Sequence, residues 1–303
     1  MKDDVRPVSS ISGAADWPVL RHFIGAEARV ASRMATHPIL AALYEFVRFG
    51  MKQAWACLFG GLMVLLLIGT HFYYPTGGAL SRYDFLFLAA LAIQALLLAL
   101  RLETLDEAKV IFTYHLVGTV MEVFKTAVGS WIYPDAAIFQ IAGVPLFSGF
   151  MYSCIGSYIC RAWMLFHFEF KAHPPVPWLI ALSAAIYINF FSHHYIIDVR
   201  WALFAATIFL FFRTRVYFTV WRSQRWMPLL LGLGLVTLFI WFAENVGTFT
   251  RTWQYPHQKY GWAMVSAGKF GSWFLLLIVS YTLVVIVRRP REWDAARSVA
   301  GAR

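Results

Sequence analysis

Charged residues are scarce in this sequence. Asp, Glu, Lys and Arg make up only 14% of its 303 residues, whereas 60% are hydrophobic. Apolar runs of about 18 residues or more recur along the chain, and each is long enough to cross a hydrocarbon core about 30 Å thick. The composition therefore argues against a soluble protein and predicts a polytopic helical membrane protein, with the lipid bilayer as its surroundings.

Cysteine is also rare, and the usual motifs built from it are missing. Cys57, Cys154 and Cys160 all fall inside apolar runs, so we expect small buried side chains and neither a disulfide framework nor a zinc knuckle. The net charge of +10 would suit a nucleic-acid-binding protein. The basic residues instead flank the apolar runs, as the positive-inside rule requires, so no nucleic-acid partner is expected. Residues 1–16 lack an apolar core, which predicts that no signal peptide lies there.

Eight apolar spans make up most of the chain. They cover residues 52–73, 84–101, 108–128, 138–166, 178–197, 200–220, 227–248 and 261–287. The sequence therefore predicts an all-α polytopic membrane protein with about eight transmembrane helices. Most Lys and Arg residues fall on one side when the N-terminus is placed inside, so both termini are expected in the cytoplasm. The turn after the fifth span is short, and the fifth and sixth spans could instead form a re-entrant pair or one broken helix.

The remaining segments divide the chain into three parts. Residues 1–50 are expected to be a cytoplasmic N-terminal segment. Within it, residues 17–50 mix apolar residues with arginines, which favours an amphipathic helix on the membrane surface, although a solvated leader fits equally well. Residues 51–288 are expected to form a single transmembrane domain, and residues 289–303 a basic cytoplasmic tail. The proline-rich loop at 167–177 is expected to be a rigid cytoplasmic turn.

One polar phrase occurs twice, with a shift of 122 residues and no gap. Its pattern is E-x3-T-x3-[ST]-W-x-Y-P. The matching pairs are Glu122 and Glu244, Thr126 and Thr248, Ser130 and Thr252, Trp131 and Trp253, Tyr133 and Tyr255, and Pro134 and Pro256. The match predicts two four-helix repeats, at about 51–170 and 175–288, related by an axis along the membrane normal.

The two glutamates are the first candidates for function. A carboxylate near the end of a span is costly unless it faces a polar interior, and intramembrane carboxylates commonly act in function. Trp and Tyr are stable at the interface, and the proline ends the helix. Glu122 and Glu244 are therefore predicted to be acid–base groups or metal ligands. The alternative is that they only hold helices together.

A histidine pair provides the second candidate. His193 and His194 stand at the end of the fifth span, and Asp198 follows His194 by one helical turn. Imidazole and carboxylate ligands suit a divalent transition metal such as Zn or Fe. We therefore predict a cluster of His193, His194, Asp198, Glu122 and Glu244 that binds such a metal. A proton relay and a purely structural polar network remain open as alternatives.

Aromatic and basic residues should surround this cluster. The residues expected at the mouth of a substrate site are Trp131, Tyr133, Trp253, Tyr255, Lys125 and Lys269. Each lysine lies near the level of the glutamates. They are expected to neutralise these carboxylates as ion pairs, or else to bind an anionic headgroup.

Long phrases of the chain resemble a known family. EVFKTAVGSWIYP, YINFFSHHYIIDVRW and AENVGTFTRTWQYP are similar to the bacterial membrane family catalogued as domain of unknown function 817, over about residues 45–290. The resemblance implies a bacterial inner-membrane protein but no established activity. A fainter likeness to small membrane carotenoid cyclases and hydratases implies that Glu122 and Glu244 protonate a polyene, although the Pro-Glu-Glu phrase of those cyclases is missing here.

These observations favour a membrane-embedded enzyme that acts on a lipid or isoprenoid near the outer leaflet. The aromatic faces around the glutamates could stabilise a carbocation there. A transporter or channel for a small ion or solute is the second hypothesis, because internal repeats with intramembrane carboxylates are common in transporters. A structural or assembly role is the third.

Overall fold

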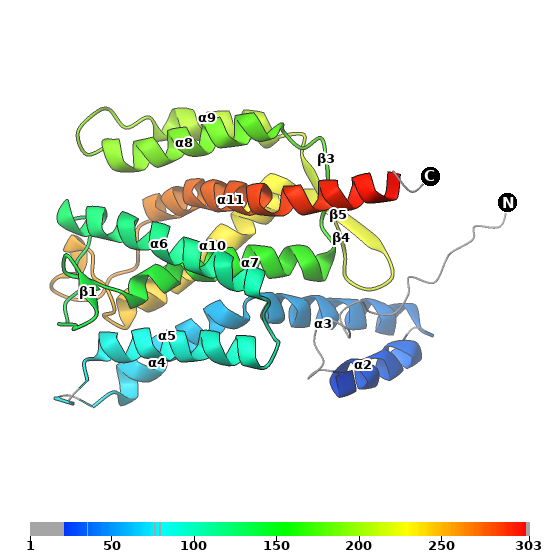
Figure 1. The fold of residues 1–303 in the computed structure, drawn as a ribbon, viewed down its shortest axis with the longest axis horizontal. Helices are drawn as coiled ribbons and strands as arrows, with labels where there is room; N and C mark the ends of the chain where they lie inside the picture. Colours follow the sequence, from blue (N-terminus) through cyan, green and yellow to red (C-terminus); the bar gives the residue numbers. More distant parts are fainter. Residues whose placement is uncertain (1–20, 35, 76, 79, 301–303) are drawn as a thin grey trace.

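The computed structural model describes residues 21–34, 36–75, 77–78 and 80–300. Residues 1–20 of the predicted N-terminal segment and residues 301–303 of the predicted tail lie outside these ranges. The chain is mostly helical, at 69%, and most of its helices run roughly along the long axis of the molecule (Figure 1). The helical prediction is confirmed at this level.

The helices follow the apolar runs of the sequence, and each predicted span contains a helix or part of one. The first group is α2 (Arg21–Met34), α3 (Pro38–Ala56), α4 (Leu58–Tyr73), α5 (Arg82–Ala99), α6 (Leu105–Ala127) and α7 (Phe147–Phe166). The second is α8 (Val176–Ser192), α9 (Arg200–Phe211), α10 (Leu229–Phe249), the short 3-10 helix η2 (Pro256–Gln258) and α11 (Ala267–Ala300). The region predicted as one amphipathic helix thus holds α2 and most of α3.

Several of these helices are those of a membrane protein. By length and composition, α5, α10 and the Ala267–Val287 part of α11 are able to cross a bilayer. The pair α3 and α4 would form a fourth span if counted together, although the two helices are bent by 71°. α8 and α9 are apolar but shorter. Within the described residues this gives up to four candidate spans, so the prediction of eight crossings stays a prediction.

Two small antiparallel sheets correct the all-α prediction. The first, β1 (Gln140–Ile141) with β2 (Val144–Pro145), lies inside the predicted fourth span. The carboxylate of Asp84 accepts hydrogen bonds from the backbone N–H groups of residues 138 and 139 and so holds this hairpin on α5. The helix of the predicted fourth span therefore begins only at Phe147, the first residue of α7.

The second sheet lies at the opposite end of the molecule and has the order β3 (Glu169–Lys171), β4 (Arg215–Thr219), β5 (Gln224–Pro228). It replaces the expected rigid turn at 167–177 and the last part of the predicted sixth span. Val216 and Phe218 are buried while their neighbours in β4 are more exposed, which is the alternation of a strand. The hydrophobic run 200–220 therefore contains α9 followed by β4, and not one continuous helix.

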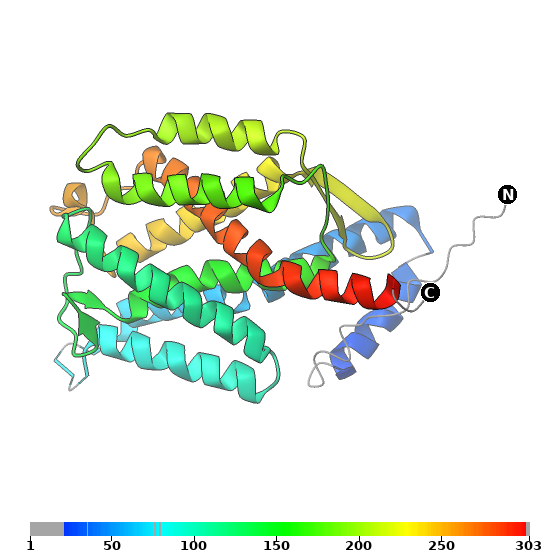
Figure 2. The ribbon, with the colours of Figure 1, turned by 45° about the horizontal axis from the view of Figure 1, so that its top comes forward.

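The two small sheets lie at opposite ends of the molecule (Figures 1 and 2). The segments after α6 and α10 gather at one end with β1, whereas β3, β4 and β5 lie at the other (Figures 1 and 2). α8 and α9 lie side by side along one edge, and α8 packs against α11 (Figure 2). The polar phrases of the sequence therefore meet at the first end.

Candidate functional site

Glu122 is buried and receives hydrogen bonds from three neutral donors. The Trp131 indole N–H lies 2.7 Å and the Tyr133 hydroxyl 2.6 Å from its Oε2, and the Tyr152 hydroxyl lies 2.7 Å from its Oε1. α6 ends at Ala127, and the chain then reverses so that Trp131 and Tyr133 return to the carboxylate. Both oxygens of this glutamate are therefore occupied by the protein itself.

Tyr152 comes from α7 and was not predicted from the sequence. It reaches Glu122 because α6 has a glycine where the tyrosine ring crosses it. A Cβ at Gly118 would lie 2.6 Å from the ring of Tyr152, which is closer than carbon atoms can pack. The close contact of α6 with α7 therefore positions the third donor.

Glu244 repeats this arrangement at the end of α10. The Trp253 indole N–H lies 2.9 Å from its Oε1, and the Tyr255 hydroxyl donates to the same oxygen. Trp273 of α11 lies close to the same carboxylate. Gly247 makes room for the indole, since a Cβ there would lie 2.1 Å from the ring of Trp253.

The two phrases contact each other directly. Below, the Glu122 segment means Glu122–Pro134 and the Glu244 segment means Glu244–Pro256. Ile132 and Gln254 form an antiparallel bridge, with both N–H to C=O distances at 2.9 Å. Each of these residues stands ten positions after its own glutamate. The two segments thus pair through equivalent residues.

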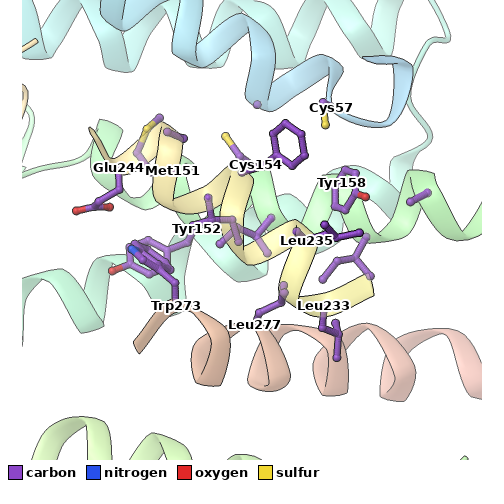
Figure 3. A pocket seen from close by; sticks show the side chains of 18 of the residues that line it. Cys57, Met151, Tyr152, Cys154, Tyr158, Leu233, Leu235, Glu244, Trp273 and Leu277 are labelled. Carbon is purple, nitrogen blue, oxygen red and sulfur yellow. The ribbon is translucent and has the colours of Figure 1, made fainter. Parts of the chain in front are cut away.

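An elongated apolar cavity begins at the two glutamates. Its volume is about 460 Å³, and its wall comes mainly from α4, α7, α10 and α11. Glu122, Glu244 and the aromatic residues of both segments line one end, while Phe49 and Val216 line the other. Figure 3 shows Glu244 at one end and Cys57 towards the other. The sequence did not predict this cavity.

The two lysines do not form the expected ion pairs with the glutamates. The Lys269 ammonium lies over the rings of Trp131 and Tyr255, at 4.8 and 4.3 Å from their centroids. The Lys125 Nζ lies 2.8 Å from Nε2 of His194. No ion pair joins either lysine to a carboxylate in the described part of the chain. The reason is that Trp and Tyr donors already occupy the glutamates.

The histidine pair lies in the loop between α8 and α9. Nδ1 of His193 is 2.9 Å from the backbone oxygen of Asn189. Burial, and then the nearby charges of Lys125, His193 and Lys269, lower the pKa of His194, so a neutral imidazole is favoured beside the ammonium. The pair therefore contacts the lysine and the backbone of α8.

Asp198 belongs to the same loop but is already paired. Arg200 Nε lies 2.5 Å from its Oδ2, and Asn189 Nδ2 lies 3.1 Å from its Oδ1. Burial alone would raise the pKa of Asp198, but hydrogen bonds from Asn189 and Arg200, together with the Arg200 charge, outweigh it and hold this pKa below its usual value.

The five predicted metal ligands are therefore not brought together. In the residues that the structure describes, no three His, Cys, Asp or Glu side chains are placed to hold a metal ion. Each predicted ligand has another partner: aromatic donors for Glu122 and Glu244, Arg200 for Asp198, Lys125 for His194 and the Asn189 backbone oxygen for His193. Two basic residues near these ligands in the sequence, Lys125 and Arg200, could have indicated that some of the ligands would be paired within the protein.

Comparison with known proteins identifies relatives without a known activity. The family model described as "Protein of unknown function (DUF817)" matches residues 45–281. The uncharacterized protein YoaT of Bacillus subtilis (strain 168) is 41% identical over 259 residues, which are 86% of this chain and 97% of that protein. No solved structure matches. The matched range contains both glutamate segments and the histidine loop.

Proposed function

Because the chain belongs to the DUF817 family, whose function is unknown, we propose a function from the geometry of its site. The protein is a membrane-embedded enzyme that binds an elongated lipid or isoprenoid and acts on it with Glu122 and Glu244. One observation carries this proposal: an apolar cavity of about 460 Å³ has two buried carboxyl groups at one end.

The size and lining of the cavity suit a hydrocarbon chain. Small-molecule sites commonly measure about 300–1,000 Å³ and are mostly apolar with a few polar groups. The cavity follows α10 from Leu233 to Glu244, a distance of roughly 16 Å at about 1.5 Å per residue. A linear apolar substrate therefore fits the wall with one end against the carboxyl groups.

The carboxyl groups are arranged for acid–base chemistry. Trp and Tyr donors of the protein fix their orientation, and a fixed carboxyl group beside an apolar substrate transfers protons effectively. Trp253 and Tyr255 both donate to Oε1 of Glu244, which leaves Oε2 for a ligand. Glu244 is therefore the better proton donor or acceptor, and the aromatic rings around it stabilise positive charge on the substrate.

We also propose that the chain crosses the bacterial inner membrane eight times, in two four-helix halves with both termini in the cytoplasm. The 122-residue shift and the bridge between Ile132 and Gln254 support an internal repeat, because a two-fold axis would bring equivalent residues together. Residues 51–288 are then one membrane domain. Residues 1–50 and 289–303 lie on the cytoplasmic side.

The test is to identify what occupies the cavity. The full chain is purified in mild detergent, and its bound lipids are extracted and measured by mass spectrometry. Leu233→Trp fills the cavity, whereas Leu231→Trp places the same ring on the exposed side of α10, where Leu231 is 53% exposed. We expect one retained apolar molecule in the wild type and in Leu231→Trp, and at least a tenfold loss in Leu233→Trp. Equal retention in both variants would contradict a ligand in the cavity.

A further inference from the structure

Three cations lie near the aromatic end of the apolar cavity, and none of them is among the residues that line it. Lys125 is at the end of α6, Lys269 at the start of α11 and Arg200 at the start of α9. The charges of Lys269 and Arg200 both act on Lys125, and the charge of Arg200 also acts on Lys269. Three helices that are distant in the sequence therefore bring positive charge to one place.

Two of these cations have no anionic partner in the described part of the chain. Lys125 is 3% exposed, and its ammonium contacts the imidazole of His194 and the ring of Phe190, whose centroid is 4.1 Å away. Lys269 rests on the rings of Trp131 and Tyr255. A neutral imidazole and aromatic faces compensate an ammonium only in part.

The nearby carboxylates do not neutralise this group. Asp198 is paired with Arg200. Glu122 and Glu244 act on Lys269 at a distance, but their oxygens accept from Trp and Tyr. Burying a cation without a close counter-ion is costly, so the cluster is incomplete without an added negative charge.

We infer that Lys125, Lys269 and Arg200, with His193 beside them, bind the anionic group of a ligand, a phosphate or phosphate ester. Cations approaching from three helices suit an anion with several oxygens, and lysine commonly binds phosphate as a point charge. His193 uses Nδ1 on the backbone of α8, which leaves Nε2 as a further hydrogen-bonding group. The inference rests on the proposed function in that the anion is the headgroup of the bound lipid or a free phosphate used with it.

The experiment measures phosphate binding by the detergent-purified full chain. The probes are inorganic phosphate, pyrophosphate, and nanodiscs of phosphatidylcholine with or without phosphatidate. Lys125→Gln and Lys269→Gln remove a charge from the cluster, and Lys259→Gln is the matched control because Lys259 is exposed in the loop after η2. We expect each cluster variant to bind the preferred probe at least tenfold more weakly than the wild type, and Lys259→Gln to match the wild type.

The outcomes separate the two sources of the anion. Binding of phosphate or pyrophosphate supports a free anion, and binding of phosphatidate nanodiscs alone supports a headgroup. No binding of any phosphate probe by the wild type overturns the inference, as does an equal loss in Lys259→Gln. If a Gln variant does not fold, Lys125→Arg and Lys269→Arg keep the charge and are expected to keep binding.

The anion site and the cavity can fail separately. Leu233→Trp fills the cavity but leaves all three cations in place, so it is expected to bind inorganic phosphate or pyrophosphate as the wild type does. If the wild-type protein binds the anion but retains no lipid in the cavity, the result would contradict the proposed function and leave the anion site supported.

Discussion

The Glu122 segment and the Glu244 segment are built alike but surrounded differently. In both, the Trp and Tyr that follow the helix return to its glutamate. Glu122 then gains Tyr152, a third neutral donor, whereas Glu244 lies near the Lys269 ammonium. The difference indicates that Glu122 is held on both oxygens and mainly organises the site, while Glu244 keeps an oxygen for chemistry.

The residue three positions after each glutamate also differs between the two segments. It is Lys125 in one segment and Gly247 in the other. The lysine reaches the histidine loop, whereas the glycine lets Trp253 lie against α10. One segment therefore contributes charge to the anion cluster, and the other contributes a tightly packed aromatic wall.

The largest expected effect is a difference in protein stability between alanine variants of the two glutamates. Glu122→Ala leaves the donors of Trp131, Tyr133 and Tyr152 unpaired, and each buried unpaired donor costs about 1–3 kcal/mol. We expect a loss on the order of 3–5 kcal/mol, and a smaller loss for Glu244→Ala, which leaves two donors unpaired, those of Trp253 and Tyr255. Denaturant unfolding in detergent measures both. A larger loss for Glu244→Ala would reverse the assignment.

A smaller effect is expected from the glycine that distinguishes the segments. Gly247→Ala forces a methyl group into the ring of Trp253 and should cost about 1–3 kcal/mol through overpacking. Gly234 is in the same helix with nothing within 4 Å of an added Cβ, so Gly234→Ala should be neutral or up to about 1 kcal/mol stabilising. Thermal unfolding of the two variants compares them. Similar stabilities would mean that the indole does not need this close approach.

The smallest effect concerns the histidine loop. The pKa of Asp198 is below its usual value, so its ionised form stabilises the fold above the ordinary Asp pKa, and this contribution is lost as pH falls through the lowered value. Asp198→Asn should therefore be less stable than the wild type at neutral pH, and the two should converge in acid. Unfolding measured from pH 7 to pH 3 tests this, and a constant difference would contradict it.

The sequence predicted the helices well where apolar runs were long, because burial in lipid and helix formation leave the same hydrophobic signal. It failed where that signal is ambiguous. The run 200–220 holds a helix and then a strand, and only the alternating burial of β4 separates them. The 138–146 segment became a hairpin because Asp84, distant in the sequence, holds it.

The site was predictable in part for a similar reason. The repeated phrase marked both glutamates with their Trp and Tyr neighbours, because these lie close together in the sequence. Tyr152 and Trp273 come from other helices and have no repeated signal of their own. The cavity was not predictable, since side chains such as Leu233 and Leu277 that line it are indistinguishable from lipid-facing ones by type.

The most direct test of the central claim compares the bound lipids of the wild type with those of Glu244→Gln. The amide keeps an acceptor oxygen for Trp253 and Tyr255 but does not transfer protons as a carboxyl group does. Mass spectrometry of lipids extracted from both purified proteins is expected to find an unconverted molecule enriched in Glu244→Gln and its converted product with the wild type. Identical lipids in both, with the same molecule displaced by Leu233→Trp, would show a binding protein and contradict an enzyme.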